Sequence, residues 1–183
     1  IREQAGISAP SSSLVKAAMI NGARDLGTAD IPNAAEGWGE VDLERTVLPM
    51  DGPTALDTFF DDRKVLSPGF GLLYSFSIDP SHGMDLTLVW TDEAGSANAA
   101  QSQARLVNNL DLVLVDPNGN EWLGNDFAQG FSTTGGTADD VNNVERIRVA
   151  PGTLSSGSGN WVVKVLHRGG SDQDFSLVMS AVA

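Results

Sequence analysis

The residues with the clearest chemical potential are acids and asparagines gathered around one expected β-hairpin. The stretch LVNNLDLVLVDPNGNEWLGNDF covers residues 106–127 and has a Pro-Asn-Gly turn signal between two apolar segments. Its two ends carry Asp111 and Asp126, in a chain that is already strongly acidic. Like charges that face each other across a sheet are destabilising. A bound cation would relieve this conflict.

The length of the turn decides which residues face each other. A two-residue turn at Asn118-Gly119 places Asp111 opposite Asp126. A longer turn over Asp116–Gly119 places Asn109 opposite Asp126 instead. In either register, Asp126 is expected beside the segment that runs from Asn109 to Asp111.

Two further acidic stretches are expected at the same end of the sheet. Asp92 follows the preceding strand, and the run DDVNNVE at residues 139–145 leads into a later one. Calcium takes roughly six to eight oxygen ligands from such side chains and from carbonyls, whereas magnesium keeps more of its water. We therefore interpret the cluster as a calcium site. The alternative is that these residues only cap turns in solvent. The candidate metal ligands are Asp92, Asn109, Asp111, Asp126, Asn143 and Glu145.

Other kinds of site find little support in the sequence. The net charge of −13, from 24 acids and 11 bases, argues against nucleic acid and against anionic membranes as partners. There is no cysteine, which excludes disulfides and thiolate chemistry. The two histidines, His82 and His167, are expected in exposed turns, and no serine stands in a Gly-x-Ser-x-Gly motif. The chain is therefore predicted to be catalytically inactive on its own.

The elements that would hold the cluster are β-strands. Apolar alternation predicts strands near residues 70–78, 84–90, 106–115, 121–124, 144–149, 161–166 and 175–182. Turn signals separate them and no helix intervenes, so the fold class is an all-β jelly roll or β-sandwich of seven to eight antiparallel strands. Of the four tryptophans, Trp90 and Trp161 are expected in the core, whereas Trp122 is expected to be partly exposed.

The first forty residues have a helical pattern, unlike the β pattern of the rest of the chain. Ser11 or Ser12 is an expected N-cap, and Leu14, Val15, Ala18 and Met19 follow at helical spacing. This helix has no expected partner beside it, so it indicates the edge of a domain whose body lies upstream. We place a boundary there, with a helix and linker over 1–47 and a β module over 48–183. Trp38 is expected to pack the linker against the upstream domain.

Several motifs resemble parts of bacterial subtilisin-like serine proteases. PSSSLVKAAMINGARDLG at 10–27, followed by EGWGEVDL at 36–43, resembles the end of their catalytic domain. The hairpin stretch, NNVERIRV at 142–149 and QDFSLVMSA at 173–181 resemble the C-terminal jelly roll that some of these enzymes carry. That jelly roll is topologically related to the P domain of proprotein convertases.

The resemblance implies a function for the chain as part of a larger enzyme. It would be an accessory, stabilising region of a secreted, extracellular serine endopeptidase, with calcium bound by the jelly roll. Its partner would be the upstream catalytic domain. The family's nucleophile motif, Gly-Thr-Ser-Met-Ala, is missing here, so none of the catalytic triad can be assigned. The alternative is a module that recruits the protease to insoluble substrate or glycan, for which the aromatic candidates are Trp122, Phe127 and Phe131.

Overall fold

The computed structural model describes residues 6–27, 30–47, 58–77, 82–98, 106–153 and 160–182. Two antiparallel sheets dominate these residues. One sheet has the strand order β1 (Thr58–Leu66), β9 (Gln173–Val182), β3 (Gly83–Trp90), β7 (Val144–Val149). The other has the order β2 (Gly71–Phe76), β8 (Trp161–Gly169), β4 (Asn109–Val115), β5 (Glu121–Ala128), β6 (Phe131–Thr134).

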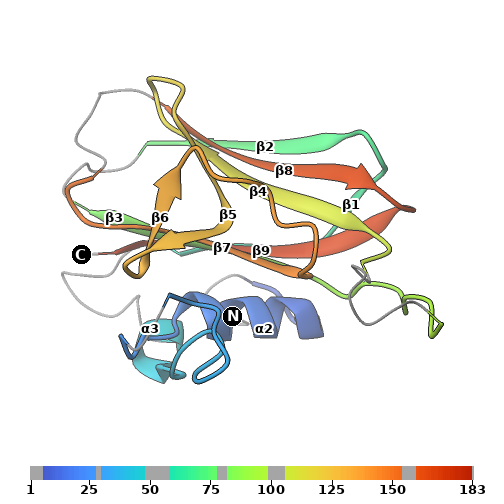
Figure 1. The fold of residues 1–183 in the computed structure, drawn as a ribbon, viewed down its shortest axis with the longest axis horizontal. Helices are drawn as coiled ribbons and strands as arrows, with labels where there is room; N and C mark the ends of the chain where they lie inside the picture. Colours follow the sequence, from blue (N-terminus) through green and yellow to red (C-terminus); the bar gives the residue numbers. More distant parts are fainter. Residues whose placement is uncertain are drawn as a thin grey trace.

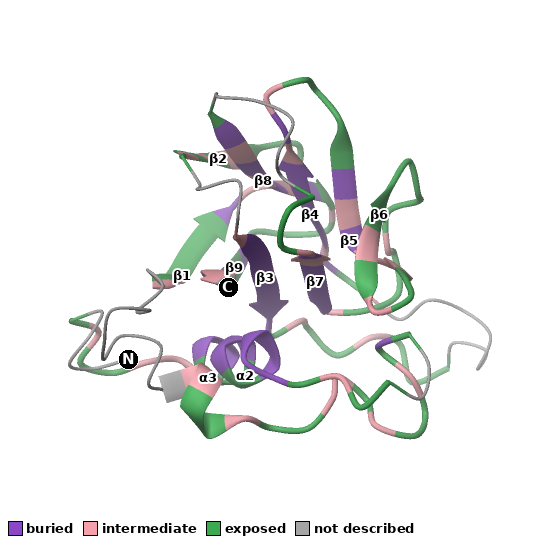
Figure 2. Ribbon diagram, turned by 90° about the vertical axis from the view of Figure 1, so that its left-hand side faces the viewer, coloured by how far each residue is buried: buried purple, intermediate pink, exposed green. Residues whose placement is uncertain are grey.

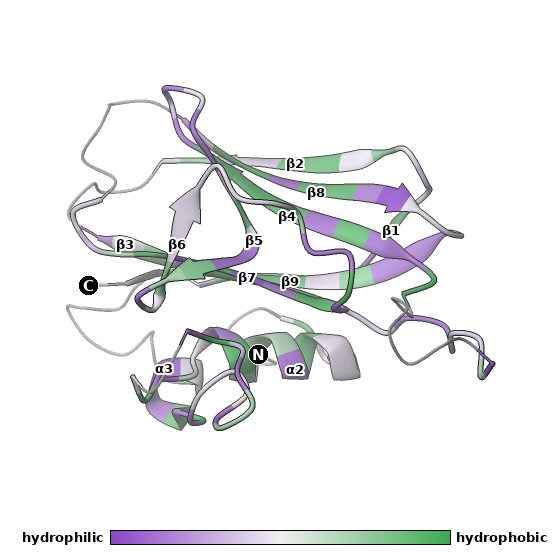
Figure 3. Cartoon of the chain, viewed as in Figure 1, coloured by the Kyte–Doolittle hydropathy of each residue, from purple (hydrophilic) through white to green (hydrophobic). Residues whose placement is uncertain are grey.

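The two sheets pack face to face, so the predicted β-sandwich is confirmed. Figure 1 shows β2, β8 and β4 in one layer and β3, β7 and β9 in the other. Leucines, valines and aromatic residues from both sheets fill the space between them, and Figure 3 shows apolar stretches along strands of both layers. Trp90 and Trp161 lie in this core, as expected, each 1% exposed. Trp122 lies there too, with its ring 5.7 Å from that of Trp161, so its predicted exposure is wrong.

The structure contains two strands that alternation did not predict. β1 carries the charged run Asp61–Lys64 in its middle and a bulge at that point, which hide its periodicity. β6 is four residues long and lies at a sheet edge. The described residues therefore form nine strands, where seven to eight were expected.

Helix α2 (Ser12–Asn21) covers the outer face of the β1-β9-β3-β7 sheet. Ser11 is its N-cap, with the Oγ accepting a hydrogen bond from the Leu14 nitrogen at 3.0 Å. The short helix α3 (Leu43–Val47) lies beside it (Figure 1). The expectation that the N-terminal helix has no partner within this chain is therefore wrong.

The helix α2 forms a third layer on this sheet, and strand β3 is buried on both faces as a result. All eight of its residues are buried, because one face looks into the sandwich and the other is covered by α2 (Figure 2). Val89 of β3, Val144 of β7 and Val178 of β9 pack against the helix residues Leu14 and Ala17. A strand in a two-layer sandwich would normally alternate between buried and exposed residues.

Arg146 of β7 anchors the N-terminal segment through hydrogen bonds. Its side chain is fully buried, and its Nη2 donates to the carbonyls of Asn21 and Ala23 at 3.1 and 3.2 Å. Its Nη1 donates to the Trp38 carbonyl at 3.4 Å. Burial lowers the pKa of Arg146 to about 10, against the opposing effect of the Asp85 carboxylate.

Trp38 packs against the cluster that α2 forms with Val89, Val144 and Val178; its expected contact with an upstream domain stays a prediction. The segment between the two helices is closed into a loop by mutual backbone bonds of 2.9 and 2.8 Å between Arg24 and Glu40. The boundary between residues 47 and 48 stays a prediction. In the described residues, no helix is long and apolar enough to cross a membrane.

Candidate functional site

The hairpin of β4 and β5 differs from both expected registers. Val115 pairs with Glu121 and Val113 with Leu123. Asp116 and Asn120 close a three-residue loop, in which Gly119 has a φ of 87°. A type I turn followed by a left-handed residue gives this geometry. The register lies one residue away from each of the two alternatives, so neither expected facing pair forms.

The strand β5 leaves β4 just after this hairpin. Pairing ends at Leu123, and Asn125 has a φ of 64°, which lies in the left-handed region. The Asn125 amide nitrogen donates to Asp139 Oδ2 at 2.6 Å and to the Val144 carbonyl at 2.7 Å. Its amide oxygen accepts from the backbone nitrogen of Arg146 at 2.9 Å. Asn125 thus joins β5 to the edge of β7, a role that its sequence position did not reveal.

Glu145 occupies the gap that β5 leaves. It lies on β7, is 1% exposed, and its Oε2 accepts from the Leu112 nitrogen of β4 at 2.6 Å. Gly124 makes room for it, since a Cβ at that position would overlap the Glu145 carboxylate. The other oxygen, Oε1, has no hydrogen-bond partner. An unpaired buried carboxylate oxygen is costly, and it marks a place where a further group would bind favourably.

The pKa of Glu145 is also affected by its burial and by neighbouring charges. Burial raises the pKa of Glu145 well above its usual value, although the hydrogen bond from Leu112 opposes the rise. The nearby carboxylates of Asp111 and Asp139 raise the pKa further, while the Arg168 guanidinium lowers it. The charges of Asp111 and Asp139 therefore act on Glu145.

Asp111 and Asn109 contribute two more oxygens of the same kind. Asp111 is 3% exposed, and its Oδ2 accepts from Arg168 Nε at 2.5 Å. Asp111 Oδ1 and Asn109 Oδ1 are buried without a hydrogen-bond partner. Arg168 supplies one positive charge beside the acids, and this partner was missed because it comes from the distant strand β8.

The other three expected ligands have structural partners. Asp92 accepts bonds from the backbone nitrogens of Val107 and Asn108 at 2.8 and 3.0 Å. Asn143 donates to the Trp90 carbonyl at 3.0 Å. Asp126 accepts from Thr133 at 3.1 Å. No described contact joins these three side chains to Glu145.

Asn108 organises the loop in which Asp92 takes part. It is 1% exposed, and its amide nitrogen donates to Gln173 Oε1 at 2.8 Å. Its amide oxygen accepts from the Ser171 nitrogen at 2.7 Å. These bonds tie the segment before β4 to the first residue of β9 and to the turn that precedes it.

The unpaired oxygens are of the kind that calcium binds, but they are too few to complete its coordination. Asn109, Asp111 and Glu145 offer unpaired oxygens, and carboxylate and amide oxygens are the ligands that calcium takes. Among the described residues, however, no group of three or more His, Cys, Asp or Glu side chains converges closely enough to hold a metal ion by itself. A bound calcium would therefore need the Asn109 oxygen, backbone carbonyls or water.

Two other expectations can be compared with the structure. His167 is 2% exposed on β8, with Nε2 2.7 Å from the Ser171 carbonyl, so its predicted place in an exposed turn is wrong. Trp122, the first aromatic candidate for sugar binding, is 6% exposed and packs in the core. Phe131 is 39% exposed, with the Arg148 guanidinium 5.4 Å from its ring centre. Trp122 is therefore buried and cannot serve as a surface contact in the alternative binding module.

A region of one known protein is similar to most of this chain. No protein-family model matches the sequence. The Dictyostelium discoideum protein named "Serine protease/ABC transporter B family protein tagA" is 35% identical over 154 residues. The match covers 80% of this chain and 9% of that protein, so the chain spans a small part of its relative.

A solved structure, the Bacillus licheniformis lipase BlEst2 in its propeptide form, overlaps 77% of this chain and 26% of the lipase chain. Its TM-score of 0.38 and sequence identity of 11% are too low to indicate a shared function. Over most of its length, this chain is thus similar to a region of a protein that is named a serine protease.

Proposed function

We propose that this chain is the C-terminal accessory region of a longer, secreted subtilisin-like serine endopeptidase. The observation that carries the proposal is the 35% identity, over 80% of the chain, to a protein named a serine protease. In this proposal the β-sandwich is a P-domain-like jelly roll. The nested pairing of β1 with β9, β2 with β8, β3 with β7 and β4 with β5 supports that topology.

The region would act by stabilising its parent enzyme. Residues 6–27 and 30–47 already pack on the sandwich through α2 and the buried Arg146, so the two parts support each other. If the N-terminal part also belongs to the catalytic domain, the sandwich adds its folding free energy to that domain. Catalysis by the Ser-His-Asp triad would come from the rest of the protein.

Calcium binding is the second part of the proposal. Asn109, Asp111 and Glu145 would hold the ion through the three side-chain oxygens that have no other partner. A bound calcium would add to the single positive charge of Arg168 beside Asp111 and Glu145 and would hold Glu145 in its ionised form. Because the ion would bind only the folded sandwich, it would stabilise that fold.

The accessory role is tested by deletion from the longer protein. Removal of residues 48–183 should leave a protease that still cleaves a peptide substrate at first but loses activity faster on heating. A matched control replaces Leu73, exposed on the edge strand β2, with alanine and should inactivate at the parent rate. Equal inactivation rates for the deletion and the parent would contradict the accessory role.

The calcium site is tested by thermal unfolding with calcium, with magnesium and with a chelator. Calcium at about one hundred times its Kd should raise the Tm by roughly 5–10 °C, and magnesium should not. Asp111→Asn should remove most of this shift, because it removes a charged oxygen from the proposed set. Asp126→Asn should keep the shift, since Asp126 bonds Thr133 instead.

The two variants also separate the two possible ligand sets. A calcium shift that disappears only in Asp126→Asn would restore the ligand set expected from the sequence and reject the smaller one. A Tm that ignores both calcium and chelator would mean that no calcium binds to these oxygens.

A further inference from the structure

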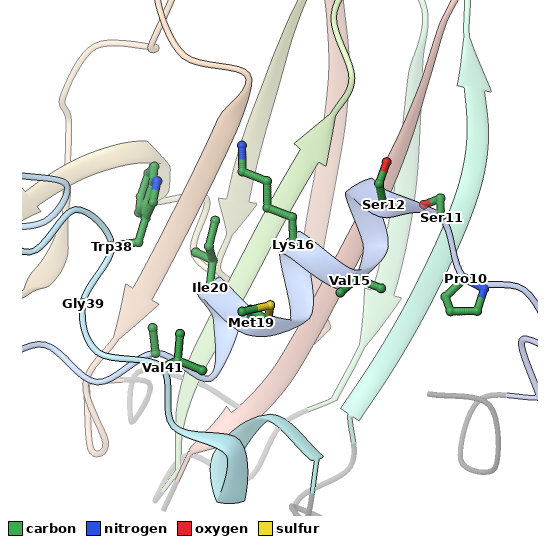
Figure 4. Close-up of a pocket in the computed structure, with 11 residues that line it drawn as sticks. Pro10, Ser11, Ser12, Val15, Lys16, Met19, Ile20, Trp38, Gly39 and Val41 are labelled. Atoms are coloured by element: carbon green, nitrogen blue, oxygen red, sulfur yellow. The ribbon is translucent and has the colours of Figure 1, made fainter.

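Two open apolar surfaces of the molecule differ in what they can bind. One is a groove along α2, where Figure 4 shows Val15, Met19 and Val41 among the lining residues. A helix satisfies its own backbone hydrogen bonds, so this groove specifies no particular shape of partner. The other is the edge of β2, the outermost strand of its layer in Figure 1. An edge strand has unpaired backbone groups, and these specify another strand as the partner.

The other three sheet edges among the described residues are protected. β1 has a bulge between Asp61 and Lys64, and the residues there are charged. β5 and β6 pack beside the edge of β7, where Asn125 accepts a hydrogen bond from the backbone nitrogen of Arg146 at 2.9 Å. β6 is only four residues long. Bulges, charges, covering elements and short strands all prevent an edge from pairing with another chain.

β2 has none of these protections. Its sequence, GLLYSF at 71–76, contains no charge and no proline, and it pairs with β8 in a regular register. Leu73 in the middle of the strand is 65% exposed, and Phe70, directly before the strand, is 68% exposed. A regular, exposed and uncharged edge of this kind is a place where a further strand can add to the sheet.

The ladder to β8 shows which backbone groups of β2 point toward the open edge. The Phe70 carbonyl accepts from the His167 nitrogen at 2.9 Å, and bonded residues alternate along an antiparallel strand. Every second residue after Phe70 therefore bonds to β8, and the residues between turn their N–H and C=O groups outward. These outward residues are Gly71, Leu73 and Ser75.

We propose that β2 pairs with β2 of a second copy of this chain, antiparallel and about a two-fold axis. With Leu73 opposite Leu73 of the copy, Gly71 lies opposite Ser75. This register pairs all the outward residues of the strand, and each pair exchanges two backbone hydrogen bonds. The two sheets that contain β2 then become one continuous sheet. The inference does not depend on the protease function proposed above.

The side chains of β2 are self-complementary in this register. On the outer face, two leucines meet at the axis with only Gly71 and Ser75 beside them, so there is room for both. On the inner face, Leu72 comes opposite Tyr74 of the copy, and both already pack against the margin of the sandwich core. Apolar and aromatic cross-strand pairs of this kind stabilise a sheet.

Charge also favours a second copy at this edge, although each copy has a net charge of −13. A two-fold axis brings residues of the same kind together, so a charged edge would face its own charge. β2 avoids this conflict because it is uncharged. In the stretch of β8 that pairs with it, the charged residue is Lys164, which donates to Glu121 at 2.9 Å. Salt screens the repulsion between more distant acids beyond about 8 Å.

Single cysteines test the pairing, because the chain has none of its own. In this register the two Cα atoms at position 73 lie about 5.5 Å apart, which a disulfide can span, whereas those at position 75 lie roughly 14 Å apart. Under mild oxidation, Leu73→Cys should form a disulfide-linked dimer. Ser75→Cys, on the same face of the same strand, should stay largely unlinked. Equal linking of the two variants, or no linking at position 73, would overturn the proposal.

Sedimentation equilibrium of the 183-residue chain measures the dimer without a cross-link. Leu73→Lys places two like charges at the axis and should raise the dissociation constant by at least about tenfold. Leu73→Ala keeps every backbone hydrogen bond and should still form the dimer. Higher salt should tighten the dimer of the parent chain, since it screens the repulsion between acids.

The fold of the variants is checked by their Tm at a dilution where the parent chain is monomeric. The three chains should have the same Tm there, because Leu73 is largely exposed within one copy. A parent chain that stays monomeric at every concentration would overturn the proposal. So would a folded Leu73→Lys variant that forms dimers as tightly as the parent.

Discussion

At the scale of single residues, a small polar network fixes the start of α2 to the sandwich. Asp62 of β1 is its centre, with a side chain that is 6% exposed. Its two oxygens accept from the Ser11 hydroxyl at 2.5 Å and the Ser11 nitrogen at 3.0 Å. The Ser176 hydroxyl of β9 donates to it at 2.8 Å. One carboxylate thus ties the N-cap residue to two strands.

This network predicts a dependence of stability on pH. Burial by itself would raise the pKa of Asp62, but the hydrogen bonds from Ser11 and Ser176 and the charge of Arg63 lower it overall. A folded-state pKa below the unfolded value means that the folded protein binds this proton less tightly. The stabilisation is therefore complete above about pH 4 and is lost as the pH falls through the lower, folded-state pKa.

The measurement is the free energy of unfolding of Asp62→Asn and of the parent between neutral and strongly acidic pH. At pH 7 the variant should be less stable by about 1–2 kcal/mol, since it loses charged acceptors at a helix N-cap. The difference should shrink as the pH falls. Asp140→Asn changes an exposed acid in the same way and should match the parent throughout. A difference that stays constant with pH would contradict this role of the Asp62 charge.

At the scale of elements, α2 is the structural link between the N-terminal segment and the sheet. Its neighbouring residues Leu14 and Val15 differ sharply, since the first is completely buried and the second is 41% exposed. The packing partners of Leu14 are Val89, Val144 and Val178, which belong to three strands of one sheet.

The pair Leu14→Ala and Val15→Ala tests this packing. In the chain of 183 residues, the first substitution leaves a cavity and should cost about 2–5 kcal/mol. The second removes methyl groups that already contact water and should cost less than about 1 kcal/mol. Urea denaturation of both variants measures the difference. Similar costs for the two would show that α2 does not pack on the sheet through Leu14.

At the scale of the whole molecule, the described residues form three layers, namely the two sheets and the N-terminal segment. Arg146 is the clearest sign that this layer belongs with the sheet. Its guanidinium is 0% exposed, and its acceptors among the described residues are carbonyls of Asn21, Ala23 and Trp38 together with the Asp85 carboxylate. Without the third layer, three of these four acceptors are absent.

A chain of residues 48–183 alone should therefore fold poorly. Removal of the first 47 residues exposes the valines beneath α2 and takes the carbonyl acceptors from Arg146. We expect a lower urea midpoint, stronger binding of a dye for apolar surfaces and a tendency to associate, each compared with residues 6–183. Equal midpoints for the two chains would instead support an independent β module that begins at residue 48.

The sequence by itself determined the β-sandwich, because apolar alternation and turn residues are local signals. It also determined that Trp90 and Trp161 are core residues and that α2 begins at a serine N-cap. The tertiary structure decided the hairpin register. A three-residue loop with Gly119 at positive φ cannot be distinguished from a two-residue or a four-residue loop by sequence spacing alone. It also decided that Arg168 faces Asp111, that Glu145 reaches β4 and that α2 covers β3. These contacts join residues far apart in the chain, and only the packing of distant strands brings them within reach of one another.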